Sequence, residues 1–440
     1  MRPYESYRPT QELWLPSIPE HWDFCKIKYA FQERAERGYP DEPLLVASQN
    51  MGVVPKEVYG SRTVEATKDL HLLKLVRTGD FVISLRSFQG GIEYAYYQGI
   101  ISPAYTVMVP NEIIVPGYFK YLAKSALFIE LLKLCVTGIR EGQNIDYVKL
   151  KNHFIPIPPR AEQEQIVRFL DAKVSRINRL IGIKQKQTAA LKELAQAEME
   201  RQLCAYPVTK TVRLKQLGTL FKGGGFSRDN LVPGRAYPAI LYGDIYTQYK
   251  YKTSAITHHI DGAAYAASRK ITKGDIVMAG TGETKDEIGK PILYMGEQTV
   301  AVGGDTIVFH PREGVYAEYL LYQLYSRAAL RHRYINGKGD IIVHIYPTAL
   351  GDTRIPLPGA EDQKTAVMRI DAVIRQVKSA SAVLAEEISA LQEYRAHLIA
   401  DAVTGRVDVR GIEISTQTPA AGGTDDRIPN CGEKAGGREV

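Results

Sequence analysis

The stretch of sequence that decides the fold occurs twice. Residues 154–165 read FIPIPPRAEQEQ, and residues 355–363 read IPLPGAEDQ. Each copy has a short apolar run, a proline stop and then an acidic, glutamine-containing segment typical of the start of a helix. The sequence around the two copies repeats without a gap, so the spacing of its parts is itself constrained. The matching pairs are Ile145 and Ile345, Leu150 and Leu350, Ile155 and Ile355, Pro156 and Pro356, Pro158 and Pro358, Gln163 and Gln363, Val167 and Val367, Asp171 and Asp371, and Ala172 and Ala372.

A long helix is predicted after each copy. In both segments apolar residues recur at alternating steps of three and four, which is the heptad pattern of helices packed along their lengths. The seam residues are Val167, Leu170, Val174, Ile177, Ile181 and Leu191 in the first segment, and Val367, Ile370, Ile374, Val377, Leu384, Ile388 and Leu391 in the second. Lys184 and Ser381 interrupt the seams at different places, as expected if the two seams pair with each other.

The alternative is that each segment forms a separate amphipathic helix lying on its own domain. The length of the pattern argues against this, because helices of globular proteins rarely exceed about 25 residues. We therefore expect two helices, near 161–203 and 361–403, that pair as a coiled coil. Each would be about 60 Å long at a rise of about 1.5 Å per residue.

Before each helix lies a β-rich block. Short runs rich in β-branched and aromatic residues alternate with glycine-rich loops, a pattern that predicts strands. The clearest runs are DFVISL (80–85) and AYTVMV (104–109) in the first block, and DIVMAG (275–280) and DTIVFH (305–310) in the second. The blocks also correspond faintly to each other, since TGDFVIS (78–84) matches KGDIVMA (273–279). The second block is therefore expected to be a variant of the first.

The predicted fold class is α+β, with two tandem α/β domains, each followed by a long helix. After Gly405 the chain becomes rich in threonine, glycine and proline, which predicts a disordered tail. The predicted segments are a first domain over 1–158, a first helix over 159–205, a second domain over 206–358, a second helix over 359–405 and a tail over 406–440.

Composition limits the possible classes of protein. The first ten residues, MRPYESYRPT, lack the apolar core of a signal peptide, and no apolar run approaches the length needed to span a bilayer. A cytoplasmic protein is expected. The four cysteines are far apart, so neither a zinc site nor a disulfide framework is indicated. The net charge of +7 is modest for 440 residues and would favour nucleic-acid binding only if concentrated on one face.

Three features together resemble the specificity subunit of type I restriction–modification systems. They are IPEHWDFCKIKY (18–29) at the entry to the first block, the two proline-rich junctions with their long helices, and DAVTGRVDVR (401–410) at the end of the second helix. The resemblance covers residues from about 18 to 410. In that family each variable block is a target recognition domain that reads one half of a bipartite DNA site.

The resemblance implies further properties. The two helices would pair as an antiparallel coiled coil with pseudo-two-fold symmetry, and would set the spacing of the half-sites. Implied partners are double-stranded DNA, two methyltransferase subunits and, in the full complex, restriction and translocase subunits. Independently, domains at the ends of a spacer of about 60 Å could address sites one helical turn of DNA, about 34 Å, or more apart. The chain itself would be non-catalytic, with no catalytic residue, cofactor or metal.

Candidate DNA contacts lie in polar loops near strand ends. Arginine can bind guanine bidentately, glutamine or asparagine can bind adenine, and lysine or threonine can bind phosphate. The candidates are Arg86, Ser87, Gln89, Arg140, Gln143 and Asn144 in the first block, and Thr281, Lys285 and Lys338 in the second. For each, an ordinary exposed loop residue is the competing interpretation.

Two other functions remain open. A self-sufficient, metal-dependent nuclease would use Asp275 and Glu283 as ligands with Lys285 nearby, although such a triad arises readily by chance in charged loops. A cytoplasmic scaffold would bind proteins rather than DNA through its two domains. No methyltransferase motif, phosphate loop or zinc site is found: GETKDEIGKP (282–291) has the wrong glycine spacing, and the histidine pair 258–259 lacks further ligands.

Overall fold

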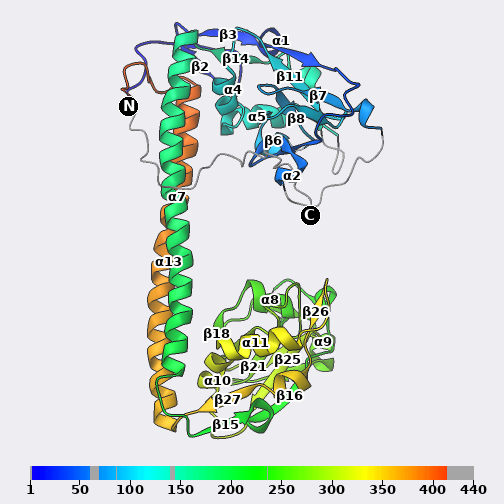
Figure 1. Ribbon diagram of the computed structural model, residues 1–440, viewed down its shortest axis with the longest axis vertical. Coiled ribbons are helices and arrows are strands. Elements are labelled where there is room, and N and C mark those ends of the chain that lie inside the picture. Colours follow the sequence, from blue (N-terminus) through cyan, green and yellow to red (C-terminus); the bar gives the residue numbers. More distant parts are fainter. Residues whose placement is uncertain (1, 60–68, 86, 139–143, 235, 414–440) are drawn as a thin grey trace, which may run out of the picture. The chain divides into compact units, whose positions relative to one another are not determined.

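The computed structural model describes residues 2–59, 69–85, 87–138, 144–234 and 236–413. They form two compact units (Figure 1). The first unit comprises 1–184 with 386–440, and the second comprises 185–385. The long helices α7 (Arg160–Leu203) and α13 (Ala360–Val403) each contribute to both units. The predicted helices near 161–203 and 361–403 are therefore confirmed.

The first unit contains a four-stranded antiparallel sheet in the order β4-β11-β8-β9. Strands β8 (Phe81–Ile83) and β11 (Thr106–Pro110) correspond to two of the predicted runs. Apolar residues of this sheet pack against helices α4 and α5 and the start of α7 to form the main core. The remaining strands are β1 (Tyr7–Pro9), β2 (Ser17–Pro19), β3 (Asp23–Lys26), β4 (Phe31–Arg34), β5 (Leu45–Ser48), β6 (Gly52–Pro55), β7 (Lys74–Val76), β9 (Glu93–Tyr94), β10 (Gly99–Ile101), β12 (Val136–Thr137), β13 (Asn144–Ile145) and β14 (Phe154–Ile157). The helices are α1 (Ile27–Ala30), α2 (Lys56–Tyr59), η1 (Leu70–Leu72), α3 (Ser87–Gly90), α4 (Pro116–Leu122), α5 (Ala126–Leu134) and α6 (Tyr147–Leu150).

The second unit contains a five-stranded sheet in the order β16-β25-β21-β23-β18 and a four-stranded sheet in the order β19-β17-β24-β20. Strands β21 (Ile276–Ala279) and β25 (Thr306–Pro311) are the other two predicted runs. The remaining strands are β15 (Lys210–Arg213), β16 (Gly218–Lys222), β17 (Tyr237–Ile240), β18 (Tyr251–Thr253), β19 (His258–Ile260), β20 (Arg269–Ile271), β22 (Thr281–Gly282), β23 (Pro291–Tyr294), β24 (Val300–Val302), β26 (Val343–His344) and β27 (Arg354–Leu357). The helices are η3 (Leu214–Gln216), η4 (Arg228–Asn230), α8 (Tyr242–Thr247), α9 (Gly262–Ala267), α10 (Ala317–Leu324), α11 (Arg327–Asn336) and α12 (Pro347–Gly351).

The repeated junction makes the same contacts in both units. β14 pairs antiparallel with β3, and β27 pairs antiparallel with β15, so each ladder joins the two ends of a block. The proline carbonyls inside these strands accept hydrogen bonds from tyrosines: Tyr118 donates to Pro156 at 3.3 Å, and Tyr319 donates to Pro356 at 3.2 Å. Proline is tolerated here because each ladder has only two strands and is therefore an edge.

The conserved spacing from proline to glutamine in the two copies has a structural cause. The Gln163 side chain donates to the Pro158 carbonyl at 2.9 Å, and Gln363 donates to Pro358 at 3.0 Å. Each bond connects the first turn of a long helix to the strand that precedes it. Gln163 also accepts from the Val115 backbone N–H, which connects α7 to the start of α4. The glutamine thus fixes where the helix leaves its block.

Within each unit, α7 contacts α13. In the first unit Lys184 pairs with Glu387 at 2.6 Å, and Arg395 donates to Asn178 at 2.5 Å. Residue numbers rise along one helix as they fall along the other, so these contacts are antiparallel. In the second unit Met199 shares a core with Val367 and its neighbours on α13. All thirteen predicted seam side chains are buried or half-buried.

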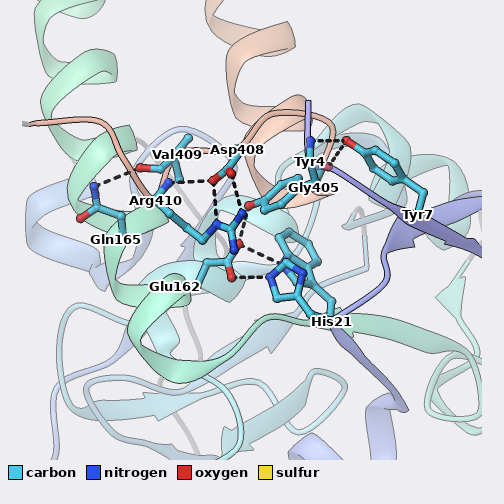
Figure 2. A network of polar contacts seen from close by, with 10 residues as sticks. Tyr4, Tyr7, His21, Glu162, Gln165, Gly405, Asp408, Val409 and Arg410 are labelled. Atoms are coloured by element: carbon cyan, nitrogen blue, oxygen red, sulfur yellow. Dashed lines mark hydrogen bonds and ion pairs between the residues drawn. The ribbon is translucent and has the colours of Figure 1, made fainter. Parts of the chain in front are cut away.

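A polar network closes the first unit around the buried Glu162 of α7 (Figure 2). Its carboxylate accepts hydrogen bonds from the Tyr4 hydroxyl and, at 3.0 Å, from the Trp22 indole, and it lies 2.9 Å from His21 Nε2. Burial and this carboxylate raise the pKa of Tyr4, so the hydroxyl remains a donor. The network therefore attaches the N-terminal segment to the first turn of α7.

The segment that follows α13 joins the same network. Gln165 donates to the carbonyls of Val409 and Ile412 at 3.2 and 3.0 Å, and the Val409 side chain is fully buried. Arg410 forms an ion pair with Asp408 that holds the pKa of this aspartate below its usual range. Residues 406–413, assigned to the tail from sequence, thus belong to the first unit. The mistake arose because this short segment has no periodicity of its own. Residues 414–440 lie outside the described residues.

Replacing Glu162 tests how much this closure stabilises the protein. Glu162→Ala leaves Tyr4, His21 and Trp22 without their shared acceptor in a buried site, and we expect a loss of about 3 kcal/mol of unfolding free energy. The matched control is Asp362→Ala at the equivalent position of the second helix. Asp362 is half-buried and, among the described residues, forms no hydrogen bond or ion pair, so its loss should be below about 1 kcal/mol. Thermal unfolding of the full chain measures both, and equal losses would contradict the proposed role of the network.

Candidate nucleic-acid interface

Both units bring the loop that follows a central strand next to the short strand that precedes the junction. In the first unit α3, which follows β8, lies against β13. In the second unit β22, which follows β21, pairs with β26. The repeat places Asn144 and His344 at equivalent positions of β13 and β26. Four of the predicted DNA-contacting residues that the structure describes lie in these paired segments: Ser87, Gln89, Asn144 and Thr281. Lys338 lies outside them but forms an isolated bridge with His344 of β26. Lys285 lies further along the loop after β22.

The first unit presents some of its predicted residues to solvent and buries another. Gln89 and Asn144 are exposed, and both can offer an amide to a base edge. Ser87 is buried: its hydroxyl accepts from the Ser84 backbone N–H at 2.8 Å and so fixes the turn before α3. Its role in this structure is to shape the loop. Arg86, Arg140 and Gln143 lie outside the described residues and remain predictions.

Gln89 lines a cleft of about 430 Å³. The polar residues Ser48, Gln49 and Asn50, at the end of β5 and in the turn after it, also line the cleft, as do Tyr59 and Tyr105. Hydroxyl, amide and aromatic groups from four separate segments thus line one hollow. Such a set can donate to and accept from base edges and can also stack on them.

In the second unit Thr281 lies beside a histidine that the sequence interpretation missed. Thr281 Oγ1 lies 3.0 Å from His344 Nδ1, and both residues line a cleft of about 180 Å³ with Lys222 and Tyr346. The Lys222 ammonium lies 5.7 Å from the centre of the half-exposed Tyr346 ring. A signal for His344 existed, because Asn144 was already a candidate at the equivalent repeat position. Lys222 and Tyr346 had no comparable signal.

The remaining predicted residues of this unit are more exposed. Lys338 is exposed and is held by two backbone hydrogen bonds to His344, at 2.9 and 2.8 Å. Lys285 is half-buried in the loop after β22. The loop that carries Lys338 also exposes Ile341 by 89% and Ile342 by 55%, which is unusual for large apolar side chains. Apolar residues at such a tip can insert between base steps of a duplex.

The backbone at β22 is held by close packing. The Tyr246 hydroxyl donates to the Thr281 carbonyl at 3.1 Å, and burial raises the pKa of this tyrosine, so it stays protonated. A Cβ on Gly282 would lie 2.7 Å from the Tyr246 oxygen. Only glycine therefore allows this approach, and Tyr246 positions the strand that presents Thr281.

The geometry of Asp275 opposes the nuclease alternative. Its carboxylate is buried, accepts from the Thr272 backbone N–H at 2.7 Å and pairs with His310 at 2.5 Å. Asp80 does the same in the first unit, where it accepts from the Arg77 backbone N–H at 2.8 Å and pairs with Arg34 at 3.0 Å. Both aspartates fix the turn before a central strand. Glu283 is exposed and lies beyond the opposite end of β21.

Substitutions can distinguish a structural role of Asp275 in fixing the turn from a catalytic role. Asp275→Ala and Asp80→Ala should each lower the unfolding free energy by about 1–3 kcal/mol, because a backbone N–H and a side-chain partner, His310 or Arg34, lose their buried acceptor. Glu283→Ala is the control and should change it by less than about 0.5 kcal/mol. Thermal unfolding and plasmid integrity in magnesium would be followed together. Magnesium-dependent cleavage that is abolished by Glu283→Ala would contradict the turn interpretation.

Two searches of the described part of the chain were negative. No helix there is long and apolar enough to cross a membrane. No group of three or more histidine, cysteine, aspartate or glutamate side chains gathers at metal-binding distance among the same residues.

No protein-family model matches this sequence, and neither does any curated protein. Solved structures do match. A chain from a structure on complex assembly and conformational transition of the type I R-M system has a TM-score of 0.66 at 16% identity, over 89% of this chain and 99% of that one. The HsdS subunit from Thermoanaerobacter tengcongensis has a TM-score of 0.46 at 16% identity, over 89% and 98%. The type I restriction–modification S subunit from M. genitalium has a TM-score of 0.34 at 14% identity, over 91% and 98%.

The first of these similarities shows a shared fold over nearly the whole of both chains. That structure is of a type I R-M system, so the fold that the sequence resemblance implies is confirmed.

Proposed function

We propose that the chain is a non-catalytic specificity subunit that reads a bipartite, asymmetric DNA target and recruits methyltransferase subunits and, through them, restriction and translocase subunits. The observation that carries this proposal is the repeat of one scaffold with two different polar surfaces. Each unit builds the same ladder, the same tyrosine–proline bond and the same aspartate turn. Each then places different side chains beside the loop that follows its central strand.

The two surfaces would read different half-sites. The first offers amides and hydroxyls around Gln89 and Asn144, which suit adenine and mixed donor–acceptor edges. The second offers His344, Thr281 and the cations Lys222 and Lys338, which suit guanine or phosphate. Ile341 at the exposed tip would add an apolar wedge. Different chemistry on equivalent scaffolds is what an asymmetric target requires. A protein that acts on DNA in this way would reside in the cytoplasm.

We further propose that α7 and α13 pair as an antiparallel coiled coil over their full lengths, with the two halves related by pseudo-two-fold symmetry. The antiparallel contacts within each unit and the burial of the seam support this pairing. In the second unit a groove of about 570 Å³ runs between the helices and is lined by Leu191, Leu194, Val383 and Leu384. This apolar surface is a candidate docking site for a methyltransferase subunit.

Exchange of one block tests the assignment of one half-site to one unit. Residues 27–153 would be replaced by the corresponding block of another specificity subunit, so that β3 and β14 still pair. The chimera, expressed with methyltransferase subunits, should change one half of the methylated motif and keep the other, as read by methylation mapping. Exchange of 214–353, between β15 and β27, is the reciprocal control and should change the other half. A change in both halves after either exchange would refute the assignment.

Salt dependence distinguishes DNA recognition from a protein scaffold. If the chain binds DNA, the logarithm of its DNA-binding constant should fall linearly with the logarithm of the salt concentration, because its cations displace counterions from the phosphates. A chain that is only a protein scaffold should show no such dependence of DNA binding on salt in the presence of methyltransferase subunits.

Substitution in the groove tests partner docking. Leu194 and Val383 are 57% and 54% exposed, so Leu194→Asp with Val383→Asp should leave Tm nearly unchanged. The same pair should weaken association with the methyltransferase subunit at least tenfold, because it places two charges in an apolar contact. Met368→Asp is the control, since Met368 is 63% exposed on α13 outside the groove. Analytical ultracentrifugation measures the association, and unchanged assembly of the double variant would exclude this groove as the docking site.

A further inference from the structure

A further cavity lies in the second unit. None of the residues that line it belongs to the candidate nucleic-acid interface. Its volume is about 620 Å³, within the range of small-molecule sites. Residues of α7, α13, β18 and the end of α10 enclose it. Its floor is aromatic and apolar, formed by Tyr251, Tyr322 and Tyr325 together with Ile374 and Val377.

The cavity is lined by more positive charge than its surroundings neutralise. Lys192, Lys250, Arg375 and Lys378 line it, and no carboxylate in the described part of this unit forms an ion pair with any of them. The acidic lining residue, Asp371, is already engaged: it pairs with Lys252 at 2.7 Å and accepts a hydrogen bond from Tyr322. The four side chains are exposed and their positive charges surround one hollow, where they would attract an anion.

The pKa of Lys250 reflects both its burial and a neighbouring charge. Burial lowers the pKa of Lys250, and the charge of Lys192 lowers it further. Lys290 lies outside the cavity. Burial lowers its pKa, Glu287 opposes this shift, and Lys250 adds to it. A bound anion would reverse the repulsive part of each shift.

The floor contains a strained residue. Tyr251 has a φ of 60°, in the left-handed region that a tyrosine rarely adopts. Its ring packs 4.7 Å from that of Tyr325, at an interplanar angle of 59°. Backbone strain of this kind costs about 1 kcal/mol or more and is concentrated at functional sites. The strained backbone holds the Tyr251 ring in the aromatic floor of the cavity.

We propose that this cavity binds a nucleotide, with its phosphates at the four cations and its base against the aromatic floor. Phosphate is favoured over a single carboxylate because several separate cations converge. A base is favoured because the aromatic rings of Tyr251 and Tyr325 line the cavity and aromatic rings stack on bases. The volume fits a compact ligand rather than a duplex, so the site is separate from the proposed reading of DNA and does not depend on it.

Calorimetric titration of the full chain with ADP, pyrophosphate and adenosine tests the proposal. ADP should bind at least tenfold more tightly than either fragment, because each fragment keeps only one half of the recognition. Equal affinity for ADP and pyrophosphate would overturn the role of the aromatic floor. Absence of saturable ADP binding would overturn the site.

Charge-matched variants localise the binding. Arg375→Gln with Lys378→Gln should weaken ADP binding at least tenfold. Arg331→Gln with Arg369→Gln removes two exposed arginines of the same unit outside the cavity and should change ADP binding less than twofold. Equal losses in the two double variants would overturn the site in favour of general electrostatic attraction. Duplex DNA affinity should be the same in both. A parallel loss of DNA and ADP binding in the cavity variant alone would assign the cavity to the DNA path instead.

Discussion

The rest of the structure depends on the two-stranded ladder that joins the ends of each β-rich block. In β3–β14 and in β15–β27 a strand near the start of a block pairs with the strand that ends it. The chain between them can therefore vary while its two ends remain in fixed positions. The tyrosine–proline bond and the proline–glutamine bond then connect this ladder to the helix that follows. The loops can therefore vary without changing how the block is attached to its helix.

The two units share this plan but differ in how they are completed. The first unit includes two further segments: Glu162 binds the segment that carries Tyr4 and Trp22, and Gln165 binds Val409 and Ile412 after α13. At the equivalent position of the second unit stands Asp362, whose shorter carboxylate forms no such network among the described residues. The second unit is built from one continuous stretch of chain and needs no such closure.

The surfaces used for recognition differ in the same way. Asp80 and Asp275 perform the same backbone function in two turns, which is why a carboxylate stands there in both copies. The residues that follow these strands have no common backbone function and are free to differ. Gln89 on one unit and Thr281 with His344 on the other are examples of this freedom. Equivalent scaffolds with divergent loops provide two readers from one architecture.

The sequence by itself determined the elements that have a local pattern. Heptad spacing predicted α7 and α13, short runs rich in β-branched and aromatic residues predicted β8, β11, β21 and β25, and the gapless repeat predicted the shared junction. Only the tertiary structure decided which distant residues meet. The pairing of Thr281 with His344, the convergence of Tyr4, Trp22 and Glu162, and the cavity between Tyr251 and Arg375 each join residues from separate elements. Periodicity reports the face of one helix or strand, and it carries no information on which face of another element lies opposite. For the same reason the segment 406–413, which contacts α7 and the N-terminal segment, could not be recognised before the fold was known.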